Sequence, residues 1–111
     1  MTTQVDIQVT QSVRDVVTAL VDRYGAEKVI LFGSMATGNS TEDSDVDLLV
    51  VKATDLPFYD RLREVALVCQ WRSAFDVLVY TPAEFAEMSR ANAFVRDEIV
   101  GKGRVLYDCA A

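Results

Sequence analysis

The sequence of 111 residues contains no histidine. This absence excludes Ser-His-Asp and Cys-His catalytic arrangements and any histidine-ligated zinc site, because each of them requires an imidazole. It also removes the side chain that most often serves as a general base. If the chain is an enzyme, carboxylates and metal ions must therefore carry its chemistry.

Cysteine and long hydrophobic runs are also scarce. The two cysteines, Cys69 and Cys109, do not form a CxxC motif, so a secreted disulfide framework is not expected. We interpret Cys69 as a core residue and Cys109 as a tail residue. No apolar run approaches the ~18 residues that a membrane span needs, and residues 1–10 do not resemble a signal peptide. These features predict a cytoplasmic protein.

Basic residues are fewer than acidic ones. The chain carries 17 acidic and 11 basic residues and has a net charge of −6. This balance argues against unaided binding to duplex DNA or to an anionic membrane. It favours a basic protein partner, or an anionic substrate that arrives with metal ions. The length predicts one domain that covers residues 1–111.

Hydrophobic periodicity and turn residues predict an alternation of helices and strands. The expected elements are a helix from Ser12 to Gly25, a strand Lys28–Phe32, a helical turn 34–37, a strand Val46–Lys52, a helix from Pro57 to about Trp71, a strand Phe75–Tyr80, a helix that starts at the capping box 81–84 and bends at Asn92, and a strand Arg104–Tyr107. Residues 2–10 fit either an edge strand or a loose arm. This order predicts an α/β (α+β) domain in which helices flank a small sheet.

The most informative motif is a Gly33-Ser34 pair followed, after ten residues, by Asp45-Val46-Asp47. Residues i and i+2 of a strand project from the same face, so Asp45 and Asp47 should lie together with Cα atoms about 6.5 Å apart. Their oxygens can then share divalent cations such as magnesium. Two such ions can hold the attacking and leaving oxygens of a phosphoryl displacement.

The Gly33-Ser34 pair supplies the expected phosphate-binding half of this site. Glycine lets the backbone approach a phosphate closely, and a helical turn that starts at Ser34 directs N–H groups and a hydroxyl at it. A third carboxylate, Asp76, lies one residue inside the apolar strand "FDVLVY". A charge at such a position is costly unless it is paired or bound to metal. The sequence thus predicts a cluster of three aspartates.

Each part of this pattern also has an ordinary structural explanation. Gly33-Ser34 alone is typical of a turn, residues 44–47 alone are typical of a solvated turn that enters a strand, and Asp76 alone could cap a neighbouring turn. Their combination at fixed spacing between two strands is what favours a functional site. An EF-hand does not fit, because Leu48 and Thr54 occupy positions that require glycine and glutamate. The P-loop and GxGxxG motifs are both absent.

The stretch "GSMATGNSTEDSDVDLLVV" resembles the GS-x10-DxD motif of the polymerase-β-like nucleotidyltransferases. The later "FDVLVYTPAEF" and "GKGRVLYD" are similar to the minimal nucleotidyltransferases (MNT proteins) of bacteria and archaea, so the resemblance covers about residues 12–108. It implies a mixed sheet flanked by helices and the transfer of a nucleoside monophosphate from Mg-NTP to a hydroxyl. By position, Gly33 and Ser34 would hold the triphosphate, while Asp45, Asp47 and Asp76 would bind two Mg²⁺ ions.

The resemblance also implies a partner. MNT proteins are often encoded beside a helical HEPN protein and act as its antitoxin, in some cases by transferring AMP from ATP to a tyrosine of that toxin. Relatives with other acceptors carry a second domain for which 111 residues leave no room, so we expect another protein or a second copy to present the acceptor. The alternative is a binding module that neutralises the HEPN partner by contact.

The remaining aromatic and basic residues are assigned ordinary roles. Exposed apolar side chains would mark the surface that meets the protein presenting the acceptor. The aromatic candidates are Phe58, Tyr59, Trp71 and Phe94, for which we favour the alternative of core residues. The basic candidates for holding phosphates or a partner are Arg61, Arg63, Arg72, Arg90 and Arg96, for which we favour the alternative of solvated helix faces.

Overall fold

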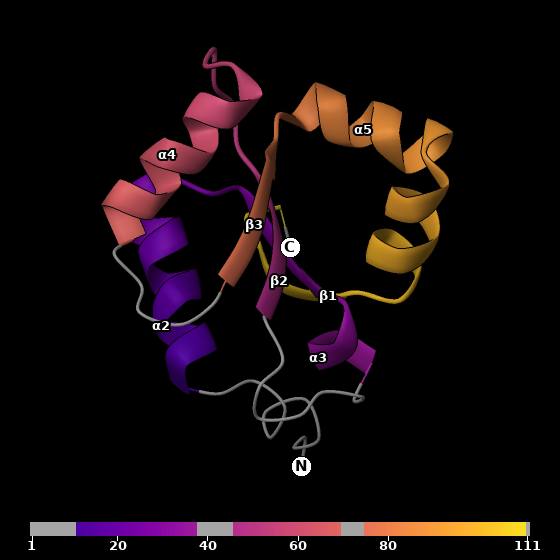
Figure 1. The fold of residues 1–111 in the computed structure, drawn as a ribbon, viewed down its shortest axis with the longest axis horizontal. Helices are drawn as coiled ribbons and strands as arrows, with labels where there is room; N and C mark the ends of the chain where they lie inside the picture. The colour runs from indigo at the N-terminus through magenta and orange to yellow at the C-terminus, as the bar shows by residue number, and fades with distance from the viewer. Residues whose placement is uncertain (1–10, 38–45, 70–74, 111) are drawn as a thin grey trace.

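The computed structural model describes residues 11–37, 46–69 and 75–110, and its four strands form one mixed sheet in the order β3-β2-β1-β4 (Figure 1). In chain order the elements are α2 (Gln11–Ala19), the π-helical turn η1 (Leu20–Tyr24), β1 (Lys28–Phe32), α3 (Ser34–Thr37), β2 (Val46–Val51), α4 (Phe58–Cys69), β3 (Phe75–Tyr80), α5 (Pro82–Ala91), the π-helix η2 (Phe94–Gly101) and β4 (Arg104–Asp108). No helix in the described ranges is long and apolar enough to cross a membrane.

The strand pairing makes the sheet mixed, as the resemblance implied. β1 runs antiparallel to both β2 and β4, whereas β2 and β3 are parallel. All four residues of the apolar run 48–51 in β2 are buried, which confirms that both faces of this central strand are covered. The expected fold class, a small mixed sheet flanked by helices, is therefore confirmed.

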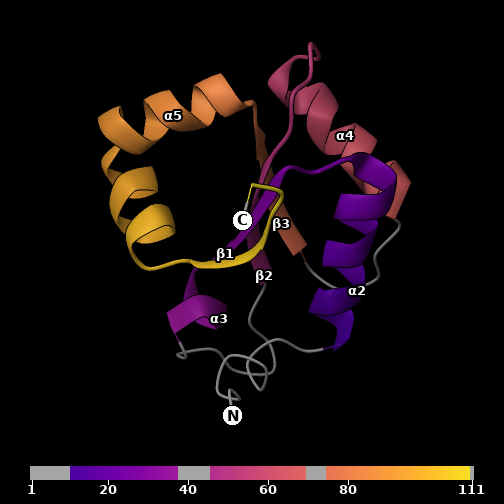
Figure 2. The same cartoon turned by 180° about the vertical axis from the view of Figure 1, so that it is seen from behind.

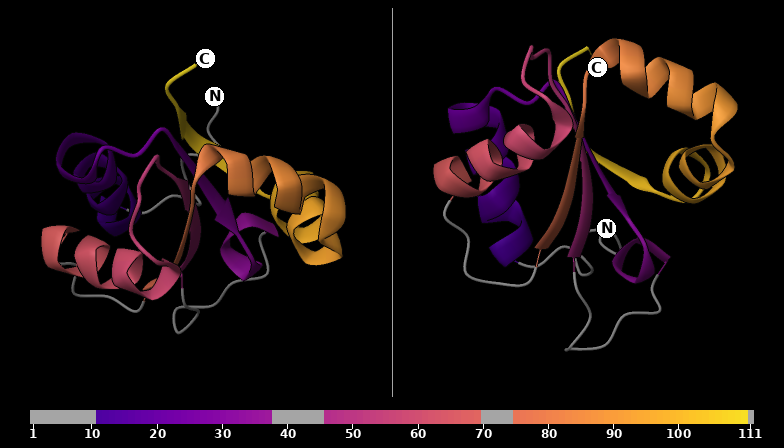
Figure 3. Two further views of the ribbon diagram at one scale, coloured as in Figure 1. Left: turned by 90° about the horizontal axis from the view of Figure 1, so that it is seen from above. Right: turned by 45° about the horizontal axis from the view of Figure 1, so that its top comes forward.

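Helices cover both faces of the sheet, as the views from behind, above and at an angle show (Figures 2 and 3). The core clusters on the two faces differ in size. On one face, α2, η1 and α4 pack against the larger core cluster, which includes Leu31, Leu48 and Val79. On the other face, η2 and α5 pack against a smaller cluster. Its buried members are Ile30, Phe32, Leu49, Val51, Val95 and Ile99.

Local signals end and begin the helices where the sequence predicts. Gly25 adopts a left-handed φ of 84° and its N–H donates to the carbonyl of Leu20, so it ends the first helix. Thr81 and Glu84 form the expected capping box at the start of α5. Asn92 separates α5 from η2 with an extended conformation. Its side-chain Oδ1 accepts a hydrogen bond from the Val95 N–H at 3.0 Å.

The interpretation of Arg61 as a solvated residue was wrong. Its side chain is buried and donates hydrogen bonds to the backbone carbonyls of Leu56 and Val79 at 2.8 and 3.0 Å. It also forms a two-pronged pair with the Glu84 carboxylate at 2.7 and 3.0 Å. This guanidinium connects α4, the end of β3 and the start of α5, a role that only the tertiary structure reveals.

Two of the aromatic assignments were also wrong. The exposed fractions of Tyr59 and Phe94 are 81% and 52%, so neither side chain belongs to the buried residues of the two core clusters. Phe58 is half-buried against Tyr80, and Cys69 is buried as expected. Arg63, Arg90 and Arg96 are exposed, which confirms their assignment. Trp71, Arg72 and residues 2–10 lie outside the described residues.

Candidate metal and nucleotide site

Asp47 and Asp76 lie side by side on neighbouring strands. Each is the second residue of its strand, and the parallel register of β2 and β3 makes them direct partners. Neighbouring strands are about 4.8 Å apart, and paired residues of a parallel ladder project to the same face. The sequence placed Asp76 on a third strand; the structure adds that this strand is the immediate neighbour of the DxD strand.

Both aspartates project from the face that α5 and η2 cover. On β2, Asp47 alternates with Leu49 and Val51, and both of these belong to the smaller core cluster. On β3, Asp76 alternates with Leu78, which packs against the same cluster. The aspartates therefore lie at the edge of this cluster, at the end of the sheet where β2 and β3 begin and β1 ends.

The Asp47 carboxylate packs against Gly33, in the space that a side chain at this position would occupy. It has a φ of 79°, a left-handed conformation that favours glycine. A Cβ atom built on Gly33 would meet Asp47 Oδ2 well inside the 3.0 Å that real Cβ atoms respect. The glycine of the GS pair thus serves two purposes in the described structure: it turns the chain from β1 into α3, and it leaves room for the first carboxylate.

The α3 turn that follows Gly33 is anchored from a distant part of the chain. Its own hydrogen bonds run from the N–H groups of Ala36 and Thr37 to the carbonyl of Gly33, at 3.1 and 3.2 Å. Arg104 at the start of β4 donates from Nε to the carbonyl of Ala36 at 3.0 Å. Sequence reasoning missed this contact, because 68 residues separate its partners and no local pattern reports it.

The full three-aspartate cluster remains a prediction. Asp45 lies outside the described residues, and within the described ranges no group of three His, Cys, Asp or Glu side chains could hold a metal ion. The strand alternation that begins at Val46 would place Asp45 on the same face as Asp47 if β2 continued by one residue. The structure therefore supplies two of the three predicted carboxylates as neighbours.

The electrostatics of this pair fit a divalent cation. Like charges directly across neighbouring strands disfavour each other. A cation between Asp47 and Asp76 would turn this repulsion into attraction. Because the donors are carboxylate oxygens next to an accessible turn, they match the ligands that magnesium prefers while it keeps waters and phosphates.

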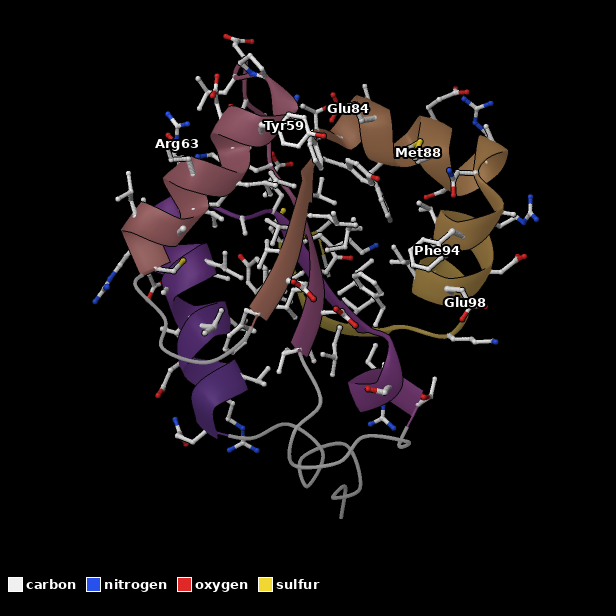
Figure 4. The ribbon with its side chains drawn as sticks, viewed as in Figure 1. Tyr59, Arg63, Glu84, Met88, Phe94 and Glu98 are labelled. Atoms are coloured by element: carbon white, nitrogen blue, oxygen red, sulfur yellow. The ribbon has the colours of Figure 1, made fainter. Side chains whose placement is uncertain are left out.

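An aromatic pair lies beside the carboxylates. Phe32 is the antiparallel partner of Asp47 across β1 and β2. Its ring contacts that of Phe94 edge-on, with the ring centroids 6.0 Å apart and an interplanar angle of 83°. Figure 4 shows Phe94 reaching from η2 toward the sheet. Sequence reasoning favoured the core for Phe94, with an acceptor-side surface as the alternative, and did not associate it with the nucleotide.

Comparison with known proteins agrees with the fold. The family model described as polymerase beta, nucleotidyltransferase matches residues 15–110. A protein of Methanocaldococcus jannaschii, provisionally named a protein adenylyltransferase, is 30% identical over 101 residues, which are 87% of this chain and 96% of that protein. A second protein of the same organism and provisional name is 30% identical over 66 residues, which are 60% of this chain and 65% of that protein.

Solved structures show the same fold. A provisionally named nucleotidyltransferase from Sulfolobus solfataricus superposes with a TM-score of 0.63 at 20% identity, over 95% of this chain and 85% of that one. A toxin–antitoxin crystallised with AMP-PNP gives a TM-score of 0.58 at 19% identity, over 89% and 74% of the two chains. The fold and the family match thus define a nucleotidyltransferase domain. The chain belongs to the polymerase beta nucleotidyltransferase family, which confirms the resemblance read from its GS-x10-DxD motif.

Proposed function

We propose that this chain is a metal-dependent protein adenylyltransferase, which transfers AMP from Mg-ATP to a tyrosine hydroxyl of a HEPN-type helical protein and thereby acts as its antitoxin. The reaction takes place in the cytoplasm, and residues 1–111 form the single domain that performs it. The observation that carries the proposal is the pairing of Asp47 with Asp76 on adjacent strands, with the carboxylate of Asp47 seated against Gly33. This arrangement is what a metal-bridged nucleotide site requires.

Each residue of the site has a specific role in the proposal. Asp45 and Asp47 would hold the Mg²⁺ ion that accompanies the triphosphate, and all three aspartates, Asp76 included, would hold a second ion. Gly33 and Ser34 hold the triphosphate, because the first N–H groups of a helical turn lack partners within the turn. When bound, two Mg²⁺ ions would neutralise the charge of the triphosphate and lower the pKa of the acceptor hydroxyl.

The transfer itself is a substitution at the α-phosphorus. The bond between the acceptor oxygen and the α-phosphorus forms as the bond to the β-phosphate oxygen breaks, and pyrophosphate leaves. In the proposal, Asp76 accepts the proton of the hydroxyl. Metal binding lowers the basicity of a carboxylate, so orienting the second metal is the larger part of its role.

Two lines support the choice of nucleotide and partner. The Methanocaldococcus jannaschii relatives are named for adenylyl transfer to protein, and one structural neighbour is a toxin–antitoxin crystallised with AMP-PNP. Another neighbour is a mutant of the MntA-HpeT toxin–antitoxin, with a TM-score of 0.52 at 18% identity. The net charge of −6 also suits a basic partner protein.

The test is the intact mass of the helical protein encoded next to this chain, after co-expression with the wild type or with Asp47→Ala. The proposal predicts a gain of one or more AMP groups with the wild type and none with the variant. An AMP gain that persists with Asp47→Ala would overturn the site assignment. An unmodified partner that still co-purifies, and is still neutralised by Asp45→Asn, would instead establish the alternative of inhibition by contact.

A further inference from the structure

We infer that Phe94 is the platform on which the base of the nucleotide stacks, an inference that rests on the proposed function. Phe94 is a large aromatic residue whose exposed fraction is 52% although it lies on the inner, sheet-facing side of η2 (Figure 4). A half-exposed ring beside a phosphate site can be covered by a nucleobase, because every base has a π-face.

The ring is held in place by contacts on both sides of it in the chain. Asn92 accepts a hydrogen bond from the Val95 N–H at 3.0 Å and so fixes the first turn of η2. Val95 is buried in the smaller core cluster. Phe32 supports the Phe94 ring with an edge-on contact at an interplanar angle of 83°. An edge-on contact between two rings leaves a face of the supported ring open for stacking.

The position of Phe94 relative to the carboxylates suits a nucleotide. Phe32 lies between them, since it pairs with Asp47 across the sheet and touches Phe94 with its ring. Phe32, Asp47 and Asp76 project from the same face of the sheet. A nucleotide whose phosphates lie at the aspartates would therefore extend its base past Phe32 onto Phe94.

Comparison with Tyr59 separates this inference from simple exposure of an aromatic side chain. Tyr59 is 81% exposed on α4, the helix on the opposite face of the sheet, and its ring partner is Phe58. It therefore cannot reach a nucleotide bound at Asp47 and Asp76. Tyr59→Ala provides a matched control, because it removes an exposed aromatic ring of similar size from the same protein.

The experiment is isothermal titration of the full chain with ATP, and separately with inorganic tripolyphosphate, both in excess Mg²⁺. Phe94→Ala should weaken ATP binding by about 5- to 150-fold, the range expected for one base–aromatic stack. Its affinity for tripolyphosphate should not change, because that ligand has no base. Phe94→Trp should restore ATP binding, and Phe94→Leu should not, since leucine keeps apolar contact with Phe32 but lacks a π-face.

The outcomes are distinguishable. Equal ATP affinity of the wild type, Phe94→Ala and Phe94→Leu would overturn the inference and leave the proposed function standing. Loss of AMP transfer to the partner in Phe94→Ala with unchanged ATP affinity would also overturn it, by assigning Phe94 to the protein interface. Failure of the wild type to bind either ligand with Mg²⁺ would overturn both proposals. Circular dichroism melting checks that each variant is folded.

Discussion

The two ends of β3 carry acidic residues in opposite settings. Beyond its C-terminal end, the Glu84 carboxylate accepts two hydrogen bonds from the buried Arg61 and one from the Thr81 N–H at 2.9 Å. At its N-terminal end, Asp76 is exposed beside Asp47, so that one carboxylate neighbours another. The first arrangement satisfies a negative charge with protein groups. The second brings two carboxylates side by side on neighbouring strands, a donor set suited to a divalent cation.

The pKa values of Glu84 and Arg61, beyond the C-terminal end of β3, reflect this difference. The hydrogen bonds from Arg61, and then the backbone N–H of Thr81, hold the pKa of Glu84 below its usual range. The hydrogen bond to Glu84 raises the pKa of Arg61, against the opposing effect of burial. Ionisation at this end therefore stabilises the fold. The comparison thus separates a carboxylate that stabilises the fold from the two carboxylates to which we assign the chemistry.

The largest expected effect comes from Gly33→Ala. The added Cβ would displace the Asp47 carboxylate, and a misplacement of about 1 Å in a catalytic group can cost about 100-fold in rate. Gly25→Ala is the matched control, because Gly25 has a similar φ of 84° but nothing within 4 Å of its added Cβ. Both variants should lose about 1 kcal/mol of stability from left-handed strain.

The measurement is the rate of AMP transfer, beside urea unfolding of both glycine variants. Only Gly33→Ala should lose transfer by about 100-fold at a similar loss of stability. Equal rates for Gly33→Ala and Gly25→Ala would show that the position of the Asp47 carboxylate against Gly33 does not matter for the reaction.

A smaller effect, on stability alone, is expected when the pair of Arg61 and Glu84 is broken. Glu84→Gln leaves the buried guanidinium of Arg61 without its counter-charge and should lower the free energy of unfolding by about 1 to 2 kcal/mol. This loss is smaller than that for breaking a fully buried ion pair, because 43% of the Glu84 side chain is exposed and solvent screens the pair. AMP transfer per folded molecule should not change.

Glu87→Gln is the control for this prediction. The pair of Glu87 with Arg90 is exposed on both sides, at 61% and 73%, so its loss should change the unfolding free energy by less than about 0.5 kcal/mol. Urea unfolding at neutral pH measures both variants. A loss in Glu84→Gln no larger than that in Glu87→Gln would refute the structural role of the buried pair.

The smallest expected effect is a pH dependence of the unfolding free energy in the acid range. Because the pKa of Glu84 is lower in the folded chain than its usual 4.5, the folded state binds fewer protons than the unfolded state. The resulting stability is fully present above pH 4.5 and is lost as the pH falls through the lowered pKa. The stability difference between wild type and Glu84→Gln should therefore shrink as the pH falls below 4.5. A constant difference across that range, in urea unfolding, would contradict the assignment.

Much of the fold could be predicted from sequence, because the signals involved are local. The bounds of β1, the end of the first helix at Gly25 and the capping box at Thr81 each depend on residues within a few positions of each other. Patterning also placed Asp76 on a strand. The family was identifiable because the GS-x10-DxD motif lies within one short stretch.

The features that the sequence did not reveal depend on contacts between distant segments. The hydrogen bonds that Arg61 donates to Glu84 span 23 residues, and the one that Arg104 donates to the carbonyl of Ala36 spans 68. The pairing of Asp47 with Asp76 depends on the strand register, which no local pattern specifies. Phe94 was misassigned because its helical position does not reveal whether a neighbouring element covers its ring.

The most direct test of the account is AMP transfer to the partner protein by Asp76→Asn, since Asp76 joins the site only through strand pairing. Mass spectrometry of the partner measures the transfer, and thermal denaturation of the variant measures its stability. We predict that transfer falls at least about 100-fold, while the melting temperature stays the same or rises because the repulsion with Asp47 is removed. Undiminished transfer by a folded Asp76→Asn would contradict the claim that the paired carboxylates form the catalytic site.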